Sequence, residues 1–340
     1  MNSATLSNDL VRKVRTKAQL LTEFPHATTP YWLFVIGVVV VVVAGYGIIL
    51  QCSGSTLTVV AALTTTFSAT SILAISVGHQ GFHGALLRSP IVNKYLGVLA
   101  FIPLGVDGSL WRRRHVMDHH PKPNSKGHDL DLDNPSLLRL APYTQRRWYH
   151  RFQHLYAPFI YSSGVVLTVC IDDFRALIPE VRRSGRSILG GFILRKLIFI
   201  LIWIMIPLAL NPHLTPGQLV ACLCLATVPT AWIFLPIAAA HLNEETHFFA
   251  QDTNMEFSTL QGETTVDFCA QSRIMTMIYG GLNCHLAHHL WPRVAGCHYP
   301  LLYTIARDEL KGSFRAPNLT LFQLLKSHFK LLQKLGLPAS

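Results

Sequence analysis

Histidines gather in three short stretches of this 340-residue chain, and each stretch follows an apolar segment. The stretches are HQGFH, HVMDHH and HLAHH, with His79, His83, His115, His119, His120, His285, His288 and His289. Neutral imidazole is a common ligand of transition metals, and rings three or four residues apart lie on one side of a helix. The pattern therefore predicts a metal centre at a membrane surface.

The spacing within the clusters favours more than one ion. His79 and His83 are four residues apart, so both rings could bind one ion if the preceding helix continues. His115 and His119 repeat that spacing, and His120 lies about 100° further round a helix, where it could reach a second ion. Alone, the first cluster also fits a polar helix end and the second fits a basic, solvated surface helix, but three clusters together favour a shared centre.

His241 ends another apolar run, at a depth that matches His79, and is the candidate ninth ligand. A histidine that is simply hydrogen-bonded at a helix end is the alternative. Nearby carboxylates could accept the second N–H of metal-bound rings, although each also fits ordinary surface solvation. The candidates are Asp118, Asp129, Asp133 and Asp267.

Half of the residues are hydrophobic and 14% are charged, which is typical of a membrane protein. Segments 31–50 and 56–77 are uncharged and long enough to cross a hydrocarbon core of about 30 Å. Segment 197–210 is short and must extend through 188–194, across Arg195 and Lys196, whereas 219–240 is a clear span. The predicted fold class is an all-α integral membrane protein with four transmembrane helices.

The positions of Lys and Arg predict the orientation, because positively charged loops stay in the cytosol. Residues 1–30, 78–196 and 241–340 contain 4, 17 and 8 of the 29, and the links 51–55 and 211–218 contain none. We therefore expect two helical hairpins, with both termini and a cytosolic helical cap holding the two metals on one side. Segments 91–106 and 157–171 are then interfacial or re-entrant, since a crossing by either alone would separate the histidines.

One domain is expected over residues 1–340. Its parts are a first transmembrane hairpin, a cytosolic region with two histidine clusters, a second hairpin and a cytosolic region with the third cluster. These parts occupy residues 31–77, 78–186, 187–240 and 241–340. The seven cysteines have no disulfide or zinc-ribbon spacing.

Longer motifs around the histidines carry a family resemblance. In order, HQGFH, WRRRHVMDHHPKPNSKGHDLDLD and GGLNCHLAHHLWPRVAGCHYP resemble the membrane fatty acyl desaturase family, and GGLN, HHLWPR and HYP are similar to its acyl-CoA and front-end branch. The resemblance covers roughly residues 30–310. It implies two iron ions (Fe²⁺/Fe³⁺), with O₂ as co-substrate. The implied ligands are His79, His83, His115, His119, His120, His241, His288 and His289.

The chain departs from that pattern at three places. Many members of the branch have Gln at the position of His285, so His285 is either a ligand or a neighbour of the site. Ile237 stands where the stearoyl-CoA type has an Asn, so a water-mediated ligand cannot be carried over. The HHPKPN stretch differs from the more usual HHTYTN.

The implied reaction inserts a carbon–carbon double bond into a fatty acyl thioester or acyl lipid. Hydroxylation, ketone formation and acetylenic-bond formation at the same site are alternatives. A histidine-rich membrane metal transporter or sensor is an alternative of another class, although segments 31–50, 56–77 and 219–240 contain no ionisable residue that would mark a conduction path.

Electrons are expected from a separate carrier of the ferredoxin or cytochrome b5 type, because the sequence has neither a GxGxxG loop nor an HPGG haem motif. Arginines of the 78–196 region could dock such a carrier or the phosphates of coenzyme A. They are Arg112–Arg114, Arg146, Arg147, Arg151, Arg182, Arg183 and Arg186. Anionic lipid explains the net charge of +11 equally well, and nucleic acid is not needed. The expected location is a bacterial inner membrane or the endoplasmic reticulum.

Overall fold

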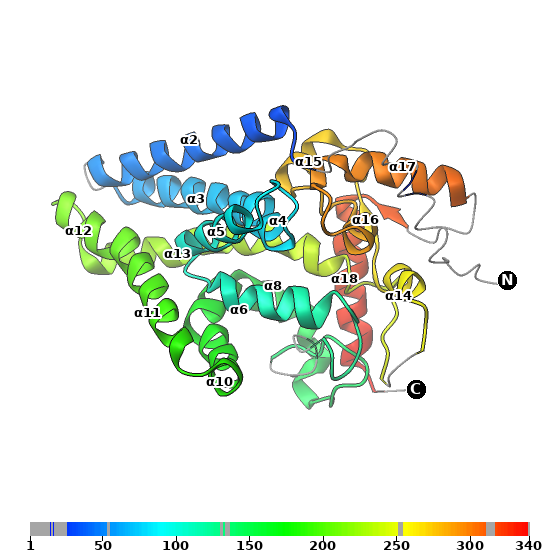
Figure 1. Ribbon diagram of the computed structural model, residues 1–340. Helices are drawn as coiled ribbons and strands as arrows, with labels where there is room; N and C mark the ends of the chain where they lie inside the picture. Colours follow the sequence, from blue (N-terminus) through cyan, green and yellow to red (C-terminus); the bar gives the residue numbers. More distant parts are fainter. Residues whose placement is uncertain are drawn as a thin grey trace.

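The computed structural model describes residues 26–52, 55–129, 137–250, 254–310 and 317–338, together with Val14, Thr16 and Leu132. Nearly all regular structure in these residues is helical. Long apolar helices form one part of the molecule, and short helices and loops that carry most of the histidines form the other (Figure 1).

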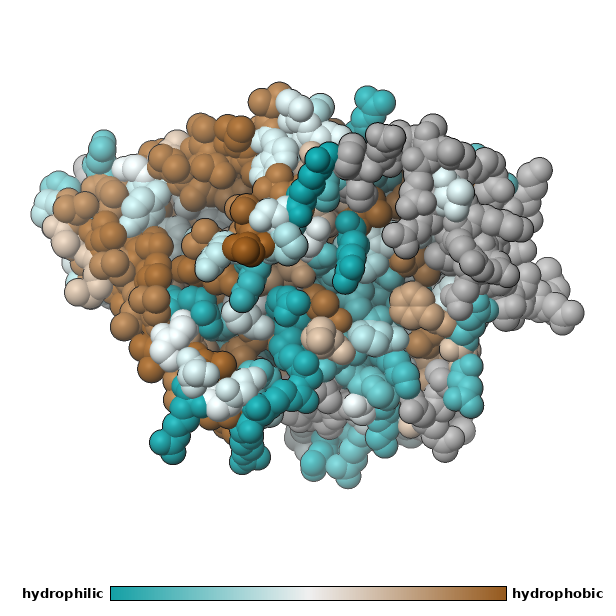
Figure 2. Space-filling model, viewed as in Figure 1, coloured by the Kyte–Doolittle hydropathy of each residue, from teal (hydrophilic) through white to brown (hydrophobic). Residues whose placement is uncertain are grey.

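Within the described residues, four helices are long and apolar enough to cross a membrane, and the four predicted spans agree with them. They are α2 (Thr29–Gln51), α3 with its continuation (Thr56–His83), α11 with its continuation (Ser187–Leu210) and α13 (Pro216–Ala239). α3 packs against both α2 and α13. Figure 2 shows apolar surface over α2, α11 and α12, as expected of helices that face lipid.

Two of these spans contain π-helical turns. α3 (Thr56–Leu73) continues through η1 (Ala74–His79) into α4 (Gln80–His83), so the second span runs directly into the first histidine cluster. α11 (Ser187–Ile200) continues through η6 (Leu201–Met205) into α12 (Ile206–Leu210). The third span therefore includes Arg195 and Lys196, as its short apolar core required.

Those two cations are paired rather than exposed to lipid. Arg195 forms a 2.6 Å ion pair with Asp107, and Lys196 forms a 2.7 Å ion pair with Asp173. Lys196 also donates to the carbonyls of Gly105 and Val169. A charge in an apolar setting is costly unless it is paired, and here every cationic group has a partner.

The ambiguous apolar segments form bent or short helices. η4 (Trp148–Phe152) and α8 (Gln153–Ser162) meet α9 (Gly164–Leu167), η5 (Thr168–Asp172) and α10 (Asp173–Ser184) at an angle of 70°. The bend fits either a broken span or a re-entrant loop. α5 (Pro90–Phe101) and η2 (Ile102–Leu104) form a helix too short for the same test.

The remaining elements surround the histidines. They are α6 (Gly108–Arg112), η3 (Arg113–His119), α14 (Phe257–Thr264), β1 (Asp267–Phe268), α15 (Arg273–Ile278), α16 (His285–Leu290), η7 (Gly296–His298), α17 (Tyr299–Leu310), β2 (Asn318–Leu319) and α18 (Leu321–Gly336). β1 and β2 pair in parallel, with Asp267 opposite Asn318.

A buried glutamine joins this region to the spans. Gln80 accepts a hydrogen bond from the N–H of Gly296 at 2.7 Å and donates to the carbonyl of Ser76. Its amide also contacts the hydroxyl of Tyr31 on α2. One side chain therefore links the first span, the second span and the loop after the third histidine cluster.

Candidate metal centre

The second span positions the first histidine cluster. η1 ends at His79 and α4 ends at His83, so both rings extend from one continuous helix, as the four-residue spacing predicted. The next residue, Gly84, has φ of 73°, a left-handed conformation that ends the helix and favours glycine. The chain then turns away and leaves both imidazoles on the side of α6.

A π-helix positions the second cluster. In η3, the N–H of His120 donates to the carbonyl of His115, five residues earlier. The wider turn brings i and i+5 together, so the Nε2 atoms of these two histidines lie 3.0 Å apart. Trp111, at the end of α6, stacks on the His115 ring with centroids 4.4 Å apart.

The ring nitrogens form two groups, and within each group the candidate ligand atoms all lie within 4.8 Å of one another. The first group is His79, His83, His115, His120 and His288. The second is His119, His241 and His289. The Nε2 atom of His285 lies 2.7 Å from that of His241, beside the second group.

This grouping differs from the pairing suggested by the spacing. His115 and His119 lie in different groups, and His120 joins His115, because η3 is a π-helix rather than an α-helix. The adjacent His288 and His289 also separate. The HLAHH cluster therefore contributes one histidine to each group instead of placing both in one group.

Hydrogen bonding alone does not account for these close contacts. The Nε2 of His115 lies 2.8 Å from that of His79 and 3.0 Å from that of His120. A neutral ring nitrogen has either one proton or one lone pair, so it cannot satisfy both neighbours. Two nitrogens bound to one ion at about 2.1 Å would lie about 3 Å apart. The donor set therefore fits a metal cofactor.

Two further observations support that fit. Among the described residues, the buried Nε2 atoms of His83 and His289 have no hydrogen-bond partner. Burial, followed by the neighbouring imidazoles, lowers the pKa of His120, His288 and His289 well below the usual value. The rings are therefore neutral at physiological pH, which is the form that binds metal.

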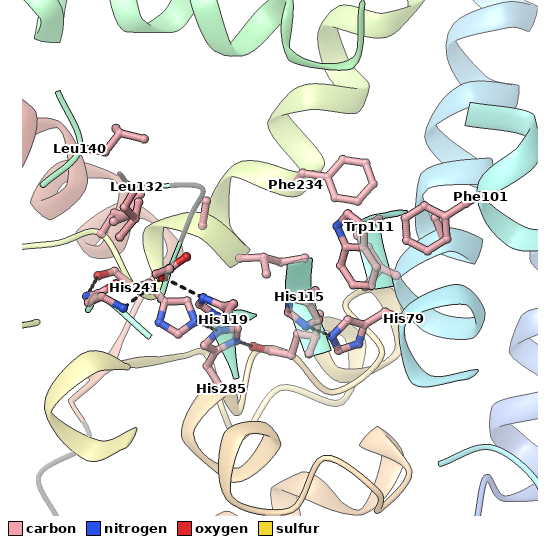
Figure 3. Close-up of a pocket in the computed structure, with 18 residues that line it drawn as sticks. His79, Phe101, Trp111, His115, His119, Leu132, Leu140, Phe234, His241 and His285 are labelled. Carbon is pink, nitrogen blue, oxygen red and sulfur yellow. Dashed lines mark hydrogen bonds and ion pairs between the residues drawn. The ribbon is translucent and has the colours of Figure 1, made fainter. Parts of the chain in front are cut away.

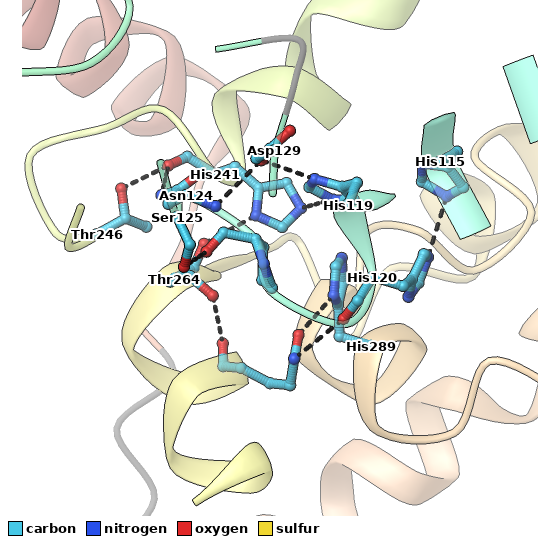
Figure 4. Close-up of polar contacts among 12 residues, drawn as sticks. His115, His119, His120, Asn124, Ser125, Asp129, His241, Thr246, Thr264 and His289 are labelled. Carbon is cyan, nitrogen blue, oxygen red and sulfur yellow. Dashed lines mark hydrogen bonds and ion pairs between the residues drawn. The ribbon is translucent and has the colours of Figure 1, made fainter. Parts of the chain in front are cut away.

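The opposite nitrogens are fixed by hydrogen bonds (Figure 4). Nδ1 of His119 donates to Asp129 at 2.9 Å, and Nδ1 of His241 donates to the carbonyl of Thr264 at 2.8 Å. His289 donates from Nδ1 to Gln261 at 2.8 Å. Such bonds orient a ring and leave Nε2 available to an ion.

Two more rings are held in the same way. Nδ1 of His285 donates to the carbonyl of Leu282 at 3.0 Å, and Nδ1 of His288 lies 3.3 Å from the hydroxyl of Tyr299. Sequence reasoning missed Tyr299 and Gln261. It also had no signal for the partners that are main-chain carbonyls.

The four candidate carboxylates have different positions. Asp129 is bonded to the His119 ring, Asp118 pairs with Arg113 at 3.6 Å, and Asp133 lies outside the described residues. Asp267 accepts from the N–H of Leu286 at 3.0 Å and so holds the start of α16. Burial raises the pKa of Asp267 to about 7.

An apolar cavity of about 300 Å³ borders both groups (Figure 3). His79 and His115 of the first group line it, as do His119 and His241 of the second. His285 also lines it. The rest of the wall is mostly apolar, and Ile237 is part of it.

A second apolar cavity of about 300 Å³ shares part of this wall. Both are lined by Phe101, Trp111, Phe234 and Ala238, and the second continues to Leu104, Val165 and other residues of α8 to η5. The two cavities are therefore neighbours on either side of these four shared side chains, and only the first is lined by histidines of the two groups.

Comparisons with known proteins agree with this arrangement. A family model described as fatty acid desaturase matches residues 53–317. The sn-1 linoleoyl-lipid 6-desaturase of Arthrospira platensis is 28% identical over 291 residues, which are 78% of this chain and 75% of the relative. The acyl-lipid (8-3)-desaturase B of Dictyostelium discoideum is 28% identical over 294 residues, but these cover only 62% of that relative.

The family match extends over most of the chain, and both relatives are named as lipid desaturases. The family, the desaturase function and the oxidoreductase class predicted from the histidine motifs are therefore confirmed. The chain belongs to the fatty acid desaturase family.

Proposed function

We propose that this protein is a membrane acyl-lipid desaturase in which the histidines hold two iron ions. The observation that carries the proposal is the apolar cavity, whose wall includes histidines of both nitrogen groups. An acyl chain in that cavity would therefore lie against the whole centre. Four residues of its wall also line a second apolar cavity, which would give a long acyl chain more room.

The ligand assignment follows from the two groups. We assign His79, His83, His115, His120 and His288 to one ion, and His119, His241, His285 and His289 to the other. An all-imidazole set suits iron, zinc, copper or nickel, and membership of a desaturase family favours iron.

The reaction requires an oxidant stronger than any side chain, which the irons with O₂ would supply. One hydrogen leaves each of two adjacent carbons, and these carbons form the double bond. The two electrons from the C–H bonds and two from an external carrier reduce O₂, with two protons, to two molecules of water. The carrier is a one-electron protein of the ferredoxin or cytochrome b5 type.

The protein's own residues would position the chain and exclude water. Phe101, Trp111 and Phe234 line both cavities and would hold the methylenes beside His115. Trp111 also fixes the His115 ring by stacking. Asn124 and Asp129 form a polar part of the first cavity's wall. Holding the acyl chain in one position determines which two adjacent carbons lie close enough to the irons to react.

The substrate class is a lipid-linked acyl chain in the bilayer. The two relatives described above are named for a linoleoyl lipid and an acyl lipid. The four apolar helices would place the cavities beside such lipids. A fatty acyl thioester is the remaining possibility within the same chemistry.

The topology that we propose is two hairpins in one domain, with both termini and the metal centre in the cytosol. The uneven distribution of Lys and Arg supports it. The meeting of histidines from all three clusters supports it as well, because it requires an even number of crossings between them, with the bent α8–α10 pair re-entrant. A bacterial inner membrane or the endoplasmic reticulum would accommodate this arrangement.

The test is lipid profiling by gas chromatography and mass spectrometry of cells that express the chain with a reductase and both types of carrier. We expect a new double bond with the wild type and none with His288→Ala. His213→Ala changes an exposed histidine outside both groups and serves as the matched control. Identical profiles for the wild type and His288→Ala, with iron bound in the wild type, would contradict the function.

A further inference from the structure

A cavity of about 790 Å³ with four cationic residues in its wall lies at the end of α4 and shares no lining residue with the two apolar cavities. Arg88, Lys94, Arg112 and Arg293 line it, and no carboxylate occurs among its described lining residues. Arg88 precedes the first turn of α5 and Lys94 lies within that helix, whereas Arg112 ends α6 and Arg293 follows α16. Figure 2 shows hydrophilic side chains on the surface over α4 and α6. Four separate segments thus contribute positive charge to one space.

His83 connects this basic cavity to the histidine groups. Among the described residues of both groups, it alone lines the basic cavity, and it does not line the apolar one. Its neighbours His79 and His115 line the apolar cavity instead. The metal centre therefore borders two cavities, of which one is mostly apolar and the other has four cationic side chains in its wall.

We propose that the basic cavity is the docking site of an acidic one-electron carrier protein, and that electrons enter the centre beside His83. The inference rests on the proposed desaturase function, because that reaction consumes two external electrons. Each docked carrier gives up one electron and is oxidised, so two carriers are used for each double bond. The irons that the histidines would hold would use these electrons to reduce O₂.

Charge and position both favour a carrier at this place. Complementary charges speed the encounter of two proteins and orient them. Electron transfer slows steeply with distance, and a redox group over the mouth of the cavity would face the ring of His83. The acyl chain occupies the other side of the centre, so carrier and substrate do not compete.

An anionic lipid headgroup is the alternative occupant, because α5 is exposed to its surroundings through Ile91, Tyr95 and Leu99. Those apolar side chains place the cavity near the membrane surface. A headgroup would neutralise the cations, but it would give no role to the histidine in the wall. Vesicles with and without anionic lipid separate the two occupants experimentally.

The experiment uses full-length, iron-loaded protein in phosphatidylcholine vesicles. Two acidic probes are tested, a plant-type [2Fe–2S] ferredoxin and the soluble haem domain of a cytochrome b5. The variant is Lys94→Glu with Arg293→Glu, and the matched control is Arg175→Glu with Arg307→Glu, at two exposed positions outside the basic cavity. The measurements are the Kd of each probe, carrier-driven product formation, and product formation driven by dithionite.

We expect the variant to raise the Kd of the preferred probe and lower carrier-driven kcat/KM by about tenfold or more, with a weaker dependence on salt. In the variant, product formation driven by dithionite should change by less than about twofold. In the control, the Kd and both kinds of product formation should also change by less than about twofold. Binding of neither probe to the wild type would overturn the proposal. So would an unchanged Kd in the variant, or equal losses in both driven reactions. A change in the variant seen only in vesicles with added phosphatidylglycerol would assign the cavity to lipid instead.

The outcome for the proposed function is separate. A wild type that binds a probe through these cations but forms no double bond, even with dithionite, would support the docking site and contradict the desaturase function.

Discussion

The main-chain N–H of His120 donates to the carbonyl of His115 at 3.0 Å, and this π-helical bond determines which rings meet. In an α-helix, residues five apart lie about 140° from each other around the axis. In the π-helix the Nε2 atoms of both residues lie 3.0 Å apart. His119, four residues after His115, instead reaches His241, with Nε2 atoms 3.1 Å apart. Because the π-helical turn is one residue longer than an α-helical turn, η3 can place His115 and His120 at one ion and His119 at the other.

Deletion of Met117 tests this relationship. Met117 is half exposed in the middle of η3, and its removal converts the five-residue interval into four. His120 would then occupy the position of His119, and both groups would lose the correct ligand. We expect bound iron, measured by plasma mass spectrometry on purified protein, to fall from about two ions to fewer than one per chain.

Met117→Ala is the matched control, because it removes the same side chain and keeps the register. It should retain the iron content of the wild type. Full iron occupancy in the deletion variant would mean that the π-helix does not select the ligands.

The membrane-spanning part of this fold is readable from sequence because apolar length is a local property. Even the short third span extended across Arg195 and Lys196 as expected. The partners of those cations were not readable, since Asp107 and Asp173 lie 88 and 23 residues away along the chain. Hydropathy measures single residues, whereas ion pairs depend on the packed structure.

The histidine site was predictable in composition but not in arrangement. The cluster motifs identified eight of the nine rings that the structure brings together, and the end of an apolar run identified the ninth, His241. Their division into two groups depends on a π-helix, for which the sequence has no simple periodic signal. The basic cavity shows the same limit, because only Arg112 of the predicted arginines lines it. Arg88, Lys94 and Arg293 meet there only after folding.

The pair of Asp107 and Arg195 is expected to contribute strongly to stability. Asp107 caps α6 by accepting from the N–H groups of Ser109 and Leu110, and its side chain is fully buried against Arg195. Arg195→Met would leave that carboxylate without its cation and cost about 3 kcal/mol. The double variant with Asp107→Asn should lose less than the sum of both single variants. Thermal unfolding in detergent measures this, and additive losses would mean that the two residues are not coupled.

Gly164 is expected to limit the length of the acyl chain. It lines the second apolar cavity, and a Cβ atom there would meet nothing within 4 Å. Gly164→Leu would fill part of that cavity and shift kcat/KM toward shorter chains by about tenfold. Gly190→Leu on α11 is the control, because its Cβ position is equally open but lies outside both apolar cavities. Competition assays with acyl chains of different length measure the shift. An unchanged preference would show that the second cavity does not hold the chain.

His328 should make stability depend on pH. The buried ring donates from Nδ1 to the carbonyl of Leu242 at 2.6 Å and accepts from the hydroxyl of Tyr161 at 2.8 Å. Burial lowers its pKa to about 4, from a usual value of 6.5. The unfolded chain therefore binds a proton first as the pH falls. The contribution of the neutral ring to the free energy of unfolding is complete above about pH 6.5 and is lost progressively down to about pH 4. Between pH 7 and pH 5 the loss is about 2 kcal/mol.

His328→Gln removes this proton uptake and keeps one donor and one acceptor. Its unfolding midpoint should fall less between pH 7 and pH 5 than that of the wild type, because the metal centre and all other groups titrate in both proteins. His213→Gln, at an exposed position, should follow the wild type. Parallel curves for the wild type and His328→Gln would mean that the buried ring takes up its proton at an ordinary pH, and that the bonds to Leu242 and Tyr161 do not hold it neutral.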